Sequence, residues 1–128
     1  MATPQETHGA FSWFELSTSA PTDARTFYGQ LLDWQFRDMG PAGTYTMINV
    51  GGKGIGGIAG APPNAKGMAP AWGGYVTVTD VDKVVAKVAG LGGKVLMPPT
   101  DIPTVGRFAT IRDPQGATLS LITYAMKN

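Results

Sequence analysis

The sequence contains no cysteine and only one histidine among its 128 residues. The absence of cysteine excludes disulfide bonds, Cys-ligated zinc, iron–sulfur clusters and a thiol nucleophile. The single histidine, His8, lies in a polar N-terminal stretch. There we expect a solvated side chain rather than a general base or a metal ligand. Chemistry that depends on thiols or on several histidines is therefore excluded.

Charge of either sign is also scarce. Ten Lys and Arg residues oppose nine Asp and Glu residues, so the formal net charge is +1 and only 15% of the residues are charged. Without a basic cluster, the chain has no strong attraction for nucleic acid or for an anionic membrane surface. It also lacks a run of 18 apolar residues and an N-terminal signal pattern. We therefore expect a cytoplasmic protein with no nucleic-acid or membrane partner.

The chain does contain enough apolar sequence for a core, since 43% of its residues are hydrophobic. A length of 128 residues is typical of one domain. We therefore expect residues 1–128 to form a single domain.

The first half of the sequence predicts a strand, a helix and three further strands. Residues 11–18 are rich in aromatic residues and alternate partly, which is typical of a strand. Thr22 or Asp23 can cap a helix that ends near Asp33–Trp34. The apolar residues that recur at helical spacing in this helix are Phe27, Leu31 and Leu32. Strands are expected at residues 34–38, 45–50 and 54–60, with turns at 40–43 and 51–53.

The second half repeats this order after a proline-rich linker at residues 61–70. Asp80 or Asp82 opens a helix that closes at Gly92–Gly93. The apolar residues of this helix are Val84, Val85, Val88 and Leu91. Strands are expected at 75–79, 94–97, 106–112 and 117–124, with a loop at 98–103 and a turn at 113–116. Two βαβββ modules, at about residues 9–60 and 71–126, therefore predict an α+β fold in which a curled mixed sheet forms a central cleft.

Five segments resemble the vicinal oxygen chelate superfamily, which contains glyoxalase I, bleomycin-resistance proteins and extradiol dioxygenases. These segments are Trp13–Thr18, Ala24–Trp34, Tyr75–Asp82, Leu91–Val95 and Gly106–Leu121. Their distinctive features are Phe-Tyr on the first helix, Gly-Gly after the second helix and Asp-Pro-Gln-Gly before the last strand. The resemblance covers nearly the whole chain and implies the two-module fold. A first-strand tryptophan and the loop Pro-Pro-Thr-Asp-Ile-Pro are similar to glyoxalase-like proteins and hydroxylases of actinobacteria.

Metal-dependent members of this superfamily hold a divalent cation with His, Glu or Gln side chains on the first and last strands of both modules. The resemblance places Trp13, Gly73 and Ser120 at three of these positions. The fourth position falls in residues 54–60, which contain only glycine, isoleucine and alanine. A cation needs several oxygen or nitrogen donors at about 2.0–2.6 Å. We therefore expect neither a metal at this site nor a cofactor.

The first strand supplies the candidate catalytic residue, Glu15. Alternation along the strand directs Phe14 and Leu16 toward the helix, and Trp13 and Glu15 into the cleft. Desolvation among aromatic side chains would let Glu15 act as a general base or anchor a cationic ligand. The alternative is a structural Glu15 that is hydrogen-bonded on its strand or paired with Arg107.

The predicted ligand-binding residues are Trp13, Tyr75, Thr77, Arg107, Ser120 and Tyr124. Trp13, Tyr75 and Tyr124 would form stacking walls for a planar ligand, an arrangement that bleomycin-resistance relatives use without a metal. Arg107 would pair with an anionic ligand or with Glu15. The alternative is that the aromatic side chains only fill the core.

These residues lead to one hypothesis and two rivals. The hypothesis is a metal-free glyoxalase/bleomycin-resistance-like protein that binds a small, partly aromatic organic molecule in the cleft between the modules. The first rival is a lyase, an isomerase or a dioxygenase-like enzyme of the same superfamily, with Glu15 as general base. The second is an interaction protein whose cleft is filled. The resemblance also implies a homodimer.

Overall fold

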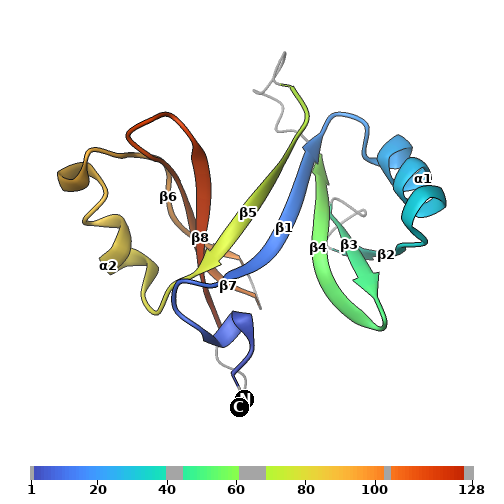
Figure 1. The fold of residues 1–128 in the computed structure, drawn as a ribbon, viewed down its shortest axis with the longest axis horizontal. Helices are drawn as coiled ribbons and strands as arrows, with labels where there is room; N and C mark the ends of the chain where they lie inside the picture. Colours follow the sequence, from blue (N-terminus) through green and yellow to red (C-terminus); the bar gives the residue numbers. More distant parts are fainter. Residues whose placement is uncertain (1, 40–44, 61–68, 103–104, 126–128) are drawn as a thin grey trace. The chain divides into compact units, whose positions relative to one another are not determined.

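The computed structural model describes residues 2–39, 45–60, 69–102 and 105–125, which fall into two compact units (Figure 1). Unit 1 comprises residues 1–12 and 74–128, and unit 2 comprises residues 13–73. The described residues form eight strands and two α-helices. The order of one strand, one α-helix and three strands occurs twice along the chain. The predicted α+β fold of two βαβββ modules is confirmed.

Unit 2 contains the first helix and the first four strands. These elements are β1 (Phe11–Thr18, of which the first two residues belong to unit 1), α1 (Pro21–Leu32), β2 (Gln35–Met39), β3 (Tyr45–Val50) and β4 (Lys53–Gly60). The strand order is β2-β3-β4-β1, where β1 runs parallel to β4 and the other pairs are antiparallel. The core consists of Leu16, Ile48 and Ile58, against which Ala24 and Tyr28 of α1 pack.

The start of α1 and its buried face differ from the prediction. Pro21 begins the helix and Ala20 is its N-cap residue without a side-chain hydrogen bond, so Thr22 and Asp23 are not the cap. Proline suits this position because its missing N–H has no helical partner there. The apolar residues used to predict the helix are exposed by 58% at Phe27, 61% at Leu31 and 46% at Leu32. They therefore do not form the core-facing side of α1.

Unit 1 contains the second helix and the last four strands. These elements are β5 (Ala71–Thr77, of which the first three residues belong to unit 2), α2 (Val81–Val85), β6 (Lys94–Ile102), β7 (Gly106–Arg112) and β8 (Thr118–Tyr124). The strand order is β5-β8-β7-β6, with β5 parallel to β8. Its core consists of Val78, Val81, Ala109 and Leu121.

Three elements of unit 1 depart from the sequence prediction. Strand β5 covers Ala71–Thr77, whereas a strand was expected at 75–79. The helix α2 ends at Val85, and a short 3-10 helix, η3 (Ala89–Leu91), follows it, so Leu91 is exposed by 75% instead of packing in the core. Strand β6 continues to Ile102 where a loop was expected, with a register shift between Met97 and Thr100. It lies at the end of the strand order. An edge strand tolerates prolines because one row of its N–H groups has no strand partner.

The predicted helix cap and turns agree with the structure better than these elements do. Asp80 caps α2 by accepting a hydrogen bond from the Lys83 N–H, and Gly51 and Gly52 have positive φ in the β3–β4 turn, as Gly116 does before β8. The predicted turn at 40–43 and nearly all of the predicted linker at 61–70 lie outside the described residues. No helix among the described residues is long and apolar enough to cross a membrane.

The N-terminal segment belongs to unit 1, although its sequence adjoins unit 2. Its 3-10 helix, η1 (Pro4–Glu6), is followed by two backbone hydrogen bonds to β5: Gly9 N–H to Thr77 O at 2.7 Å and Thr77 N–H to Ala10 O at 2.8 Å. His8 accepts a hydrogen bond at Nδ1 from the Thr79 N–H, at 2.9 Å. The histidine thus has a structural contact as well as the expected exposure.

Candidate functional site

In each unit, the strands have one face that packs on the helix and one that does not. In unit 2, Leu16 lies on the helix-packed face, in the core with Ala24 and Tyr28 of α1. Side chains alternate between the two faces of a strand. Trp13 and Glu15 therefore lie on the opposite face, which we call the helix-free face of unit 2, as the sequence predicted.

A tyrosine that the sequence analysis missed lies beside Trp13 on this face. The indole Nε1–H of Trp13 donates a hydrogen bond to the Tyr45 hydroxyl at 2.9 Å. A Cβ on Gly57 would overlap the Tyr45 phenol ring, so this ring lies directly over the glycine backbone of β4. A Cβ on Gly54 would likewise meet Met47 and Trp13. The glycines of β4 therefore make room for a Trp13–Tyr45 platform, which strand periodicity alone does not reveal.

Glu15 lies next to this platform and is partly buried. Its Cα pairs with that of Gly57, the residue that Tyr45 covers. The next position across the sheet is Met47, which in turn pairs with the exposed Arg37 of β2. One face thus carries an aromatic surface, a carboxylate and a guanidinium. This combination suits stacking and charge-assisted hydrogen bonding, and it includes a possible proton acceptor.

The helix-free face of unit 1 carries four of the predicted site residues, and two of them, Tyr75 and Ser120, lie side by side on neighbouring strands. The Tyr75 ring contacts Phe108 with centroids 6.2 Å apart, and Ser120 Oγ lies 3.0 Å from Thr110 Oγ1. Tyr75 and Ser120 are also Cα partners on neighbouring strands. The sequence therefore placed Tyr75 and Ser120 correctly on one face.

Thr77 and Tyr124 lie on the same face but hold the N-terminal segment. Ser12 Oγ lies 2.8 Å from both the Tyr124 hydroxyl and Thr77 Oγ1, and Thr77 Oγ1 also donates to the Pro4 carbonyl at 2.9 Å. Thr77 is only 5% exposed. Burial raises the pKa of Tyr124, and its hydrogen bond with Ser12 opposes this shift. These contacts give Thr77 and Tyr124 a structural role that the sequence analysis did not anticipate.

Arg107 lies on the opposite face from the one predicted. Its guanidinium binds both carboxylate oxygens of Asp82 on α2, at 2.9 and 3.1 Å, and Asp101 Oδ1 on β6 at 3.0 Å. The hydrogen bonds to Asp82, followed by the one to Asp101, raise the pKa of Arg107. Arg107 alternates with Phe108, which contacts Tyr75 on the helix-free face. Arg107 therefore braces α2 and β6, and the prediction that it lies in the cleft, where it would pair with Glu15 or an anionic ligand, is wrong.

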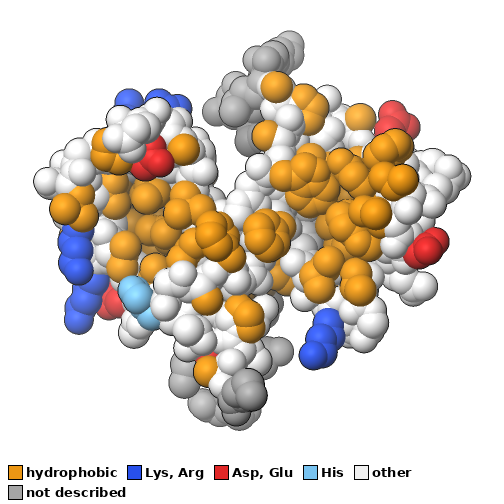
Figure 2. All heavy atoms as spheres, viewed as in Figure 1, with side chains coloured by type: hydrophobic (Ala, Val, Ile, Leu, Met, Phe, Trp, Pro, Cys, Tyr) orange, Lys and Arg blue, Asp and Glu red, His pale blue; other side chains and the backbone are white. Residues whose placement is uncertain are grey.

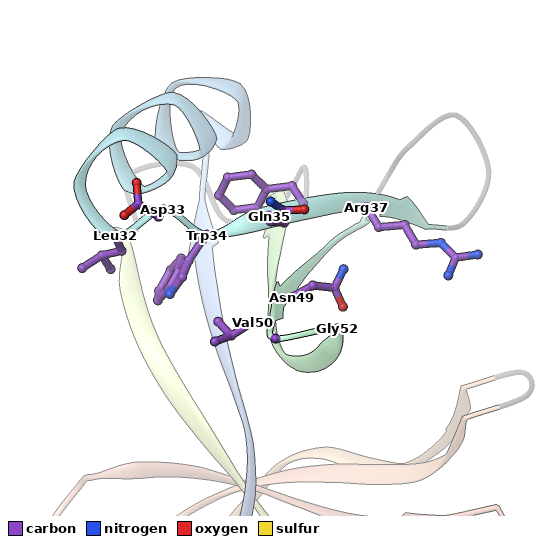
Figure 3. Close-up of a pocket in the computed structure, with 10 residues that line it drawn as sticks. Leu32, Asp33, Trp34, Gln35, Arg37, Asn49, Val50 and Gly52 are labelled. Carbon is purple, nitrogen blue, oxygen red and sulfur yellow. The ribbon is translucent and has the colours of Figure 1, made fainter.

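A pocket of about 650 Å³ lies in unit 2 where α1, β2 and the β3–β4 turn meet (Figure 3), and it shares Arg37 with the helix-free face. It is lined by Leu32, Asp33, Trp34, Gln35, Phe36, Arg37, Asn49, Val50, Gly51 and Gly52. None of the predicted site residues is among them. In Figure 3 the side chains of Trp34 and Val50 lie on one side of the start of β2, and those of Asn49 and Arg37 lie on the other. The lining contains one carboxylate, Asp33, so it offers hydrogen bonding rather than a carboxylate pair for acid–base catalysis.

The comparisons with known sequences point to one family. The family model described as Glyoxalase/Bleomycin resistance protein/Dioxygenase superfamily matches residues 10–121. "Putative glyoxylase CFP32" of Mycobacterium tuberculosis is 41% identical over 117 residues, covering 88% of this chain and 45% of that protein. "Anthracycline biosynthesis protein DauV" of Streptomyces sp. is 30% identical over 128 residues, covering 88% of this chain and 46% of that protein. The chain spans about half the length of these curated relatives.

Solved structures show the same fold at lower sequence identity. Methylmalonyl-CoA epimerase from M. tuberculosis has a TM-score of 0.65 and 15% identity, covering 92% of this chain and 89% of that chain. The Mn(II)-bound glyoxalase from Novosphingobium aromaticivorans has a TM-score of 0.61 and 16% identity, covering 90% of this chain and 39% of that chain. These likenesses support the fold and do not assign a reaction.

The residues at the expected ligand positions do not fit a metal ion. Trp13 offers an N–H donor that is already bonded to Tyr45, and Gly73 has no side chain. Ser120 shares its hydroxyl with Thr110. Within the described parts of the chain, no three His, Asp or Glu side chains come together as a ligand group. A divalent cation needs several such donors converging on one point.

Proposed function

We propose that this chain, which belongs to the glyoxalase/bleomycin resistance protein/dioxygenase superfamily, binds a small, partly aromatic organic molecule without the help of a metal. The observation that carries the proposal is the Trp13–Tyr45 platform beside Glu15 on the helix-free face of unit 2. The indole N–H bonded to the phenol oxygen fixes two rings relative to each other. A fixed platform loses little side-chain entropy when a planar molecule stacks on it.

The charges around the platform define the ligand further. Glu15 accepts hydrogen bonds from an amine or a hydroxyl group, and Arg37 attracts a carboxylate, a phosphate or a phenolate. The relative named for anthracycline biosynthesis supports a planar ligand, because anthracyclines contain fused aromatic rings. The favoured ligand therefore has a planar ring system with a polar substituent at its edge.

A thermal-shift screen with planar heterocycles and phenols tests this proposal. A ligand that raises the Tm of the wild type should bind Trp13→Phe and Tyr45→Phe at least about 10-fold more weakly, because each variant loses the ring-to-ring hydrogen bond. Trp72→Phe is the matched control, since it changes a tryptophan that contacts Tyr28 instead, and it should bind normally. If no compound in the panel raises the Tm, the result would favour the rival hypothesis, an interaction protein whose cleft is filled.

Metal content is measured on the same preparations. Elemental analysis of protein purified without chelator should find far less than one equivalent of any divalent metal. A full equivalent that is lost in Trp13→Phe or Ser120→Ala would contradict the metal-free site.

The alternative function is an enzyme that uses Glu15 as general base, either a lyase or isomerase, or a dioxygenase-like enzyme with a metal recruited elsewhere. It is favoured by the partly buried carboxylate beside the Trp13–Tyr45 platform and by the relatives named as glyoxylases. Glu15→Gln separates the two functions, because glutamine keeps the size and hydrogen-bonding capacity of the side chain but accepts no proton. Turnover should fall by about 100-fold or more if Glu15 abstracts a proton, whereas ligand affinity should change little for a binding protein.

A further inference from the structure

We propose that unit 1 has a phosphate-binding site at two neighbouring cations, Lys94 and Arg112. Lys94 begins β6 and Arg112 ends β7, and their Cα atoms are partners in the sheet. We call these two residues the cation pair. Neither belongs to the Trp13–Tyr45 platform in unit 2, so the site stands independently of the proposed function.

The cation pair lies on the helix-free face of unit 1. Ile111 packs against the core that the strands share with α2, so its neighbour Arg112 lies on the opposite face. Val95 pairs with Ile111, which places Lys94 on the same face as Arg112. Thr118 of β8 is the Cα partner of Arg112 on its other side. Two cations and a hydroxyl therefore lie in one row across three strands.

Neither member of the cation pair has a partner for its charge within the described part of the chain. Both residues are exposed, and their side chains make no hydrogen bond or ion pair with a described residue. Figure 2 shows Lys and Arg side chains at the margin of unit 1, where solvent reaches them. The next carboxylate along the chain, Asp113, accepts hydrogen bonds from the N–H groups of Gln115 and Ala117 in the turn before β8. Two positive charges are therefore left for an anion.

The fold itself does not require charge at this place. In unit 2 the first residue of the strand after the helix is Gln35, and its Cα partner on the next strand is Asn49. This neutral pair holds the position that the cation pair holds in unit 1. Like charges on directly opposite residues of neighbouring strands weaken a sheet. Residues that break a local rule without a structural need are typical of functional sites.

The charge and geometry of the pair favour a phosphate group. A phosphate monoester carries about −1.5 to −2 charges at pH 7 and three strong acceptor oxygens. It therefore balances two cations, whereas a carboxylate balances only one. The planar guanidinium of Arg112 can donate to two phosphate oxygens, and the Lys94 ammonium can donate to the third. The Thr118 hydroxyl provides a further donor beside Arg112.

The neighbouring row of the same face favours an organic phosphate over the free ion. It lies two residues along the strands from the cation pair, at about 7 Å. It carries Thr110 and Ser120, whose hydroxyl oxygens are 3.0 Å apart, and Tyr75, the Cα partner of Ser120. A planar group attached to the phosphate can contact this row, because it combines hydroxyl groups with an aromatic ring.

Backbone amide NMR of the full chain, titrated with inorganic phosphate and with phenyl phosphate at a constant ionic strength of about 0.1 M, tests the site. Both probes should produce saturable shifts at the amides of Lys94, Arg112 and Thr118. The double variant Lys94→Gln/Arg112→Gln should raise both Kd values about 10-fold or more, because it removes the charge-assisted hydrogen bonds. Tighter binding of phenyl phosphate would identify an organic phosphate as the ligand, and equal affinities would identify the free ion.

Lys87→Gln is the matched control, because it removes the same charge from another exposed lysine of unit 1. It should leave both Kd values unchanged. Lys94→Glu should abolish phosphate binding and yet be at least as stable as the wild type, since it places opposite charges across β6 and β7. A wild type without saturable shifts would overturn the proposal. So would an unchanged Kd in the double variant, or an equal loss of affinity in Lys87→Gln.

Discussion

Three glycines of β4 allow a sharp test of how closely this strand is packed. A Cβ on Gly56 would overlap the backbone carbonyl oxygen of Phe14 on β1, a Cβ on Gly57 would overlap the Tyr45 ring, and a Cβ on Gly60 would meet nothing within 4 Å. None of the three has a positive φ. The three Gly→Ala substitutions therefore differ in what they displace and not in backbone strain.

The expected stabilities follow from what each methyl group meets. Gly56→Ala must push β1 and β4 apart, and overpacking of this kind costs about 2 kcal/mol or more. Gly57→Ala must displace the Tyr45 ring and break its bond to Trp13, which costs about 1 kcal/mol. Against this, alanine gains about 0.5–1 kcal/mol over glycine inside a strand. Gly57→Ala should therefore be nearly neutral in stability, and Gly60→Ala should be neutral or slightly stabilising.

Urea unfolding and thermal scans measure these differences. The alanine gain applies to Gly56→Ala as well, so its net cost is about 1–1.5 kcal/mol or more. At about 4 °C per kcal/mol for a chain of this size, Gly56→Ala should lower the Tm by at least about 4–6 °C, while the other two should stay within about 3 °C of the wild type. Gly57→Ala should nevertheless lose affinity for any ligand found by the screen, because its platform is displaced. The reasoning is refuted if Gly56→Ala is as stable as Gly60→Ala, or if Gly57→Ala binds ligand as the wild type does.

Two further predictions concern the hydroxyls that hold the N-terminal segment. Because burial raises the pKa of Tyr124 above its ordinary 10.0, the folded protein binds this proton more tightly than the unfolded chain does. The resulting stability is present below about pH 10 and is lost as the pH rises through the folded-state pKa, so urea unfolding above pH 10 should show a smaller loss for Tyr124→Phe than for the wild type. Ser12→Ala should cost about 1–3 kcal/mol in the same assay, because it removes the partner of both Thr77 and Tyr124. The exposed Ser17→Ala should change almost nothing, and an equal loss in both serine variants would contradict the role given to Ser12.

The sequence predicted the strands well because their signals are local. Aromatic and β-branched residues between turn residues placed β1 and β3 at their observed limits. The turns around Gly51–Gly52 and Gly116 followed from glycines that adopt positive φ. The end of β6 was missed because prolines suggest a loop, and they are tolerated in a strand only at a sheet edge. Whether a strand lies at an edge depends on the whole topology and not on its own residues.

The candidate site was only partly predictable, for a similar reason. Alternation correctly placed Trp13 and Glu15 on one face, since period two is a property of a single strand. It could not reveal Tyr45, whose ring reaches over β4 only because Gly57 has no side chain. It also misplaced Arg107, whose carboxylate partners come from α2 and β6. Contacts between strands decide these positions, and they have no signature within one segment.

The helix α1 shows why an apolar pattern does not by itself define a core. Phe27 and Leu31 recur at helical spacing, yet α1 packs on its sheet through Ala24 and Tyr28. Small and amphipathic residues allow the helix to approach the sheet closely, and this leaves the larger apolar side chains pointing outward. Residues at the spacing that predicts a buried stripe therefore lie on the surface of the helix.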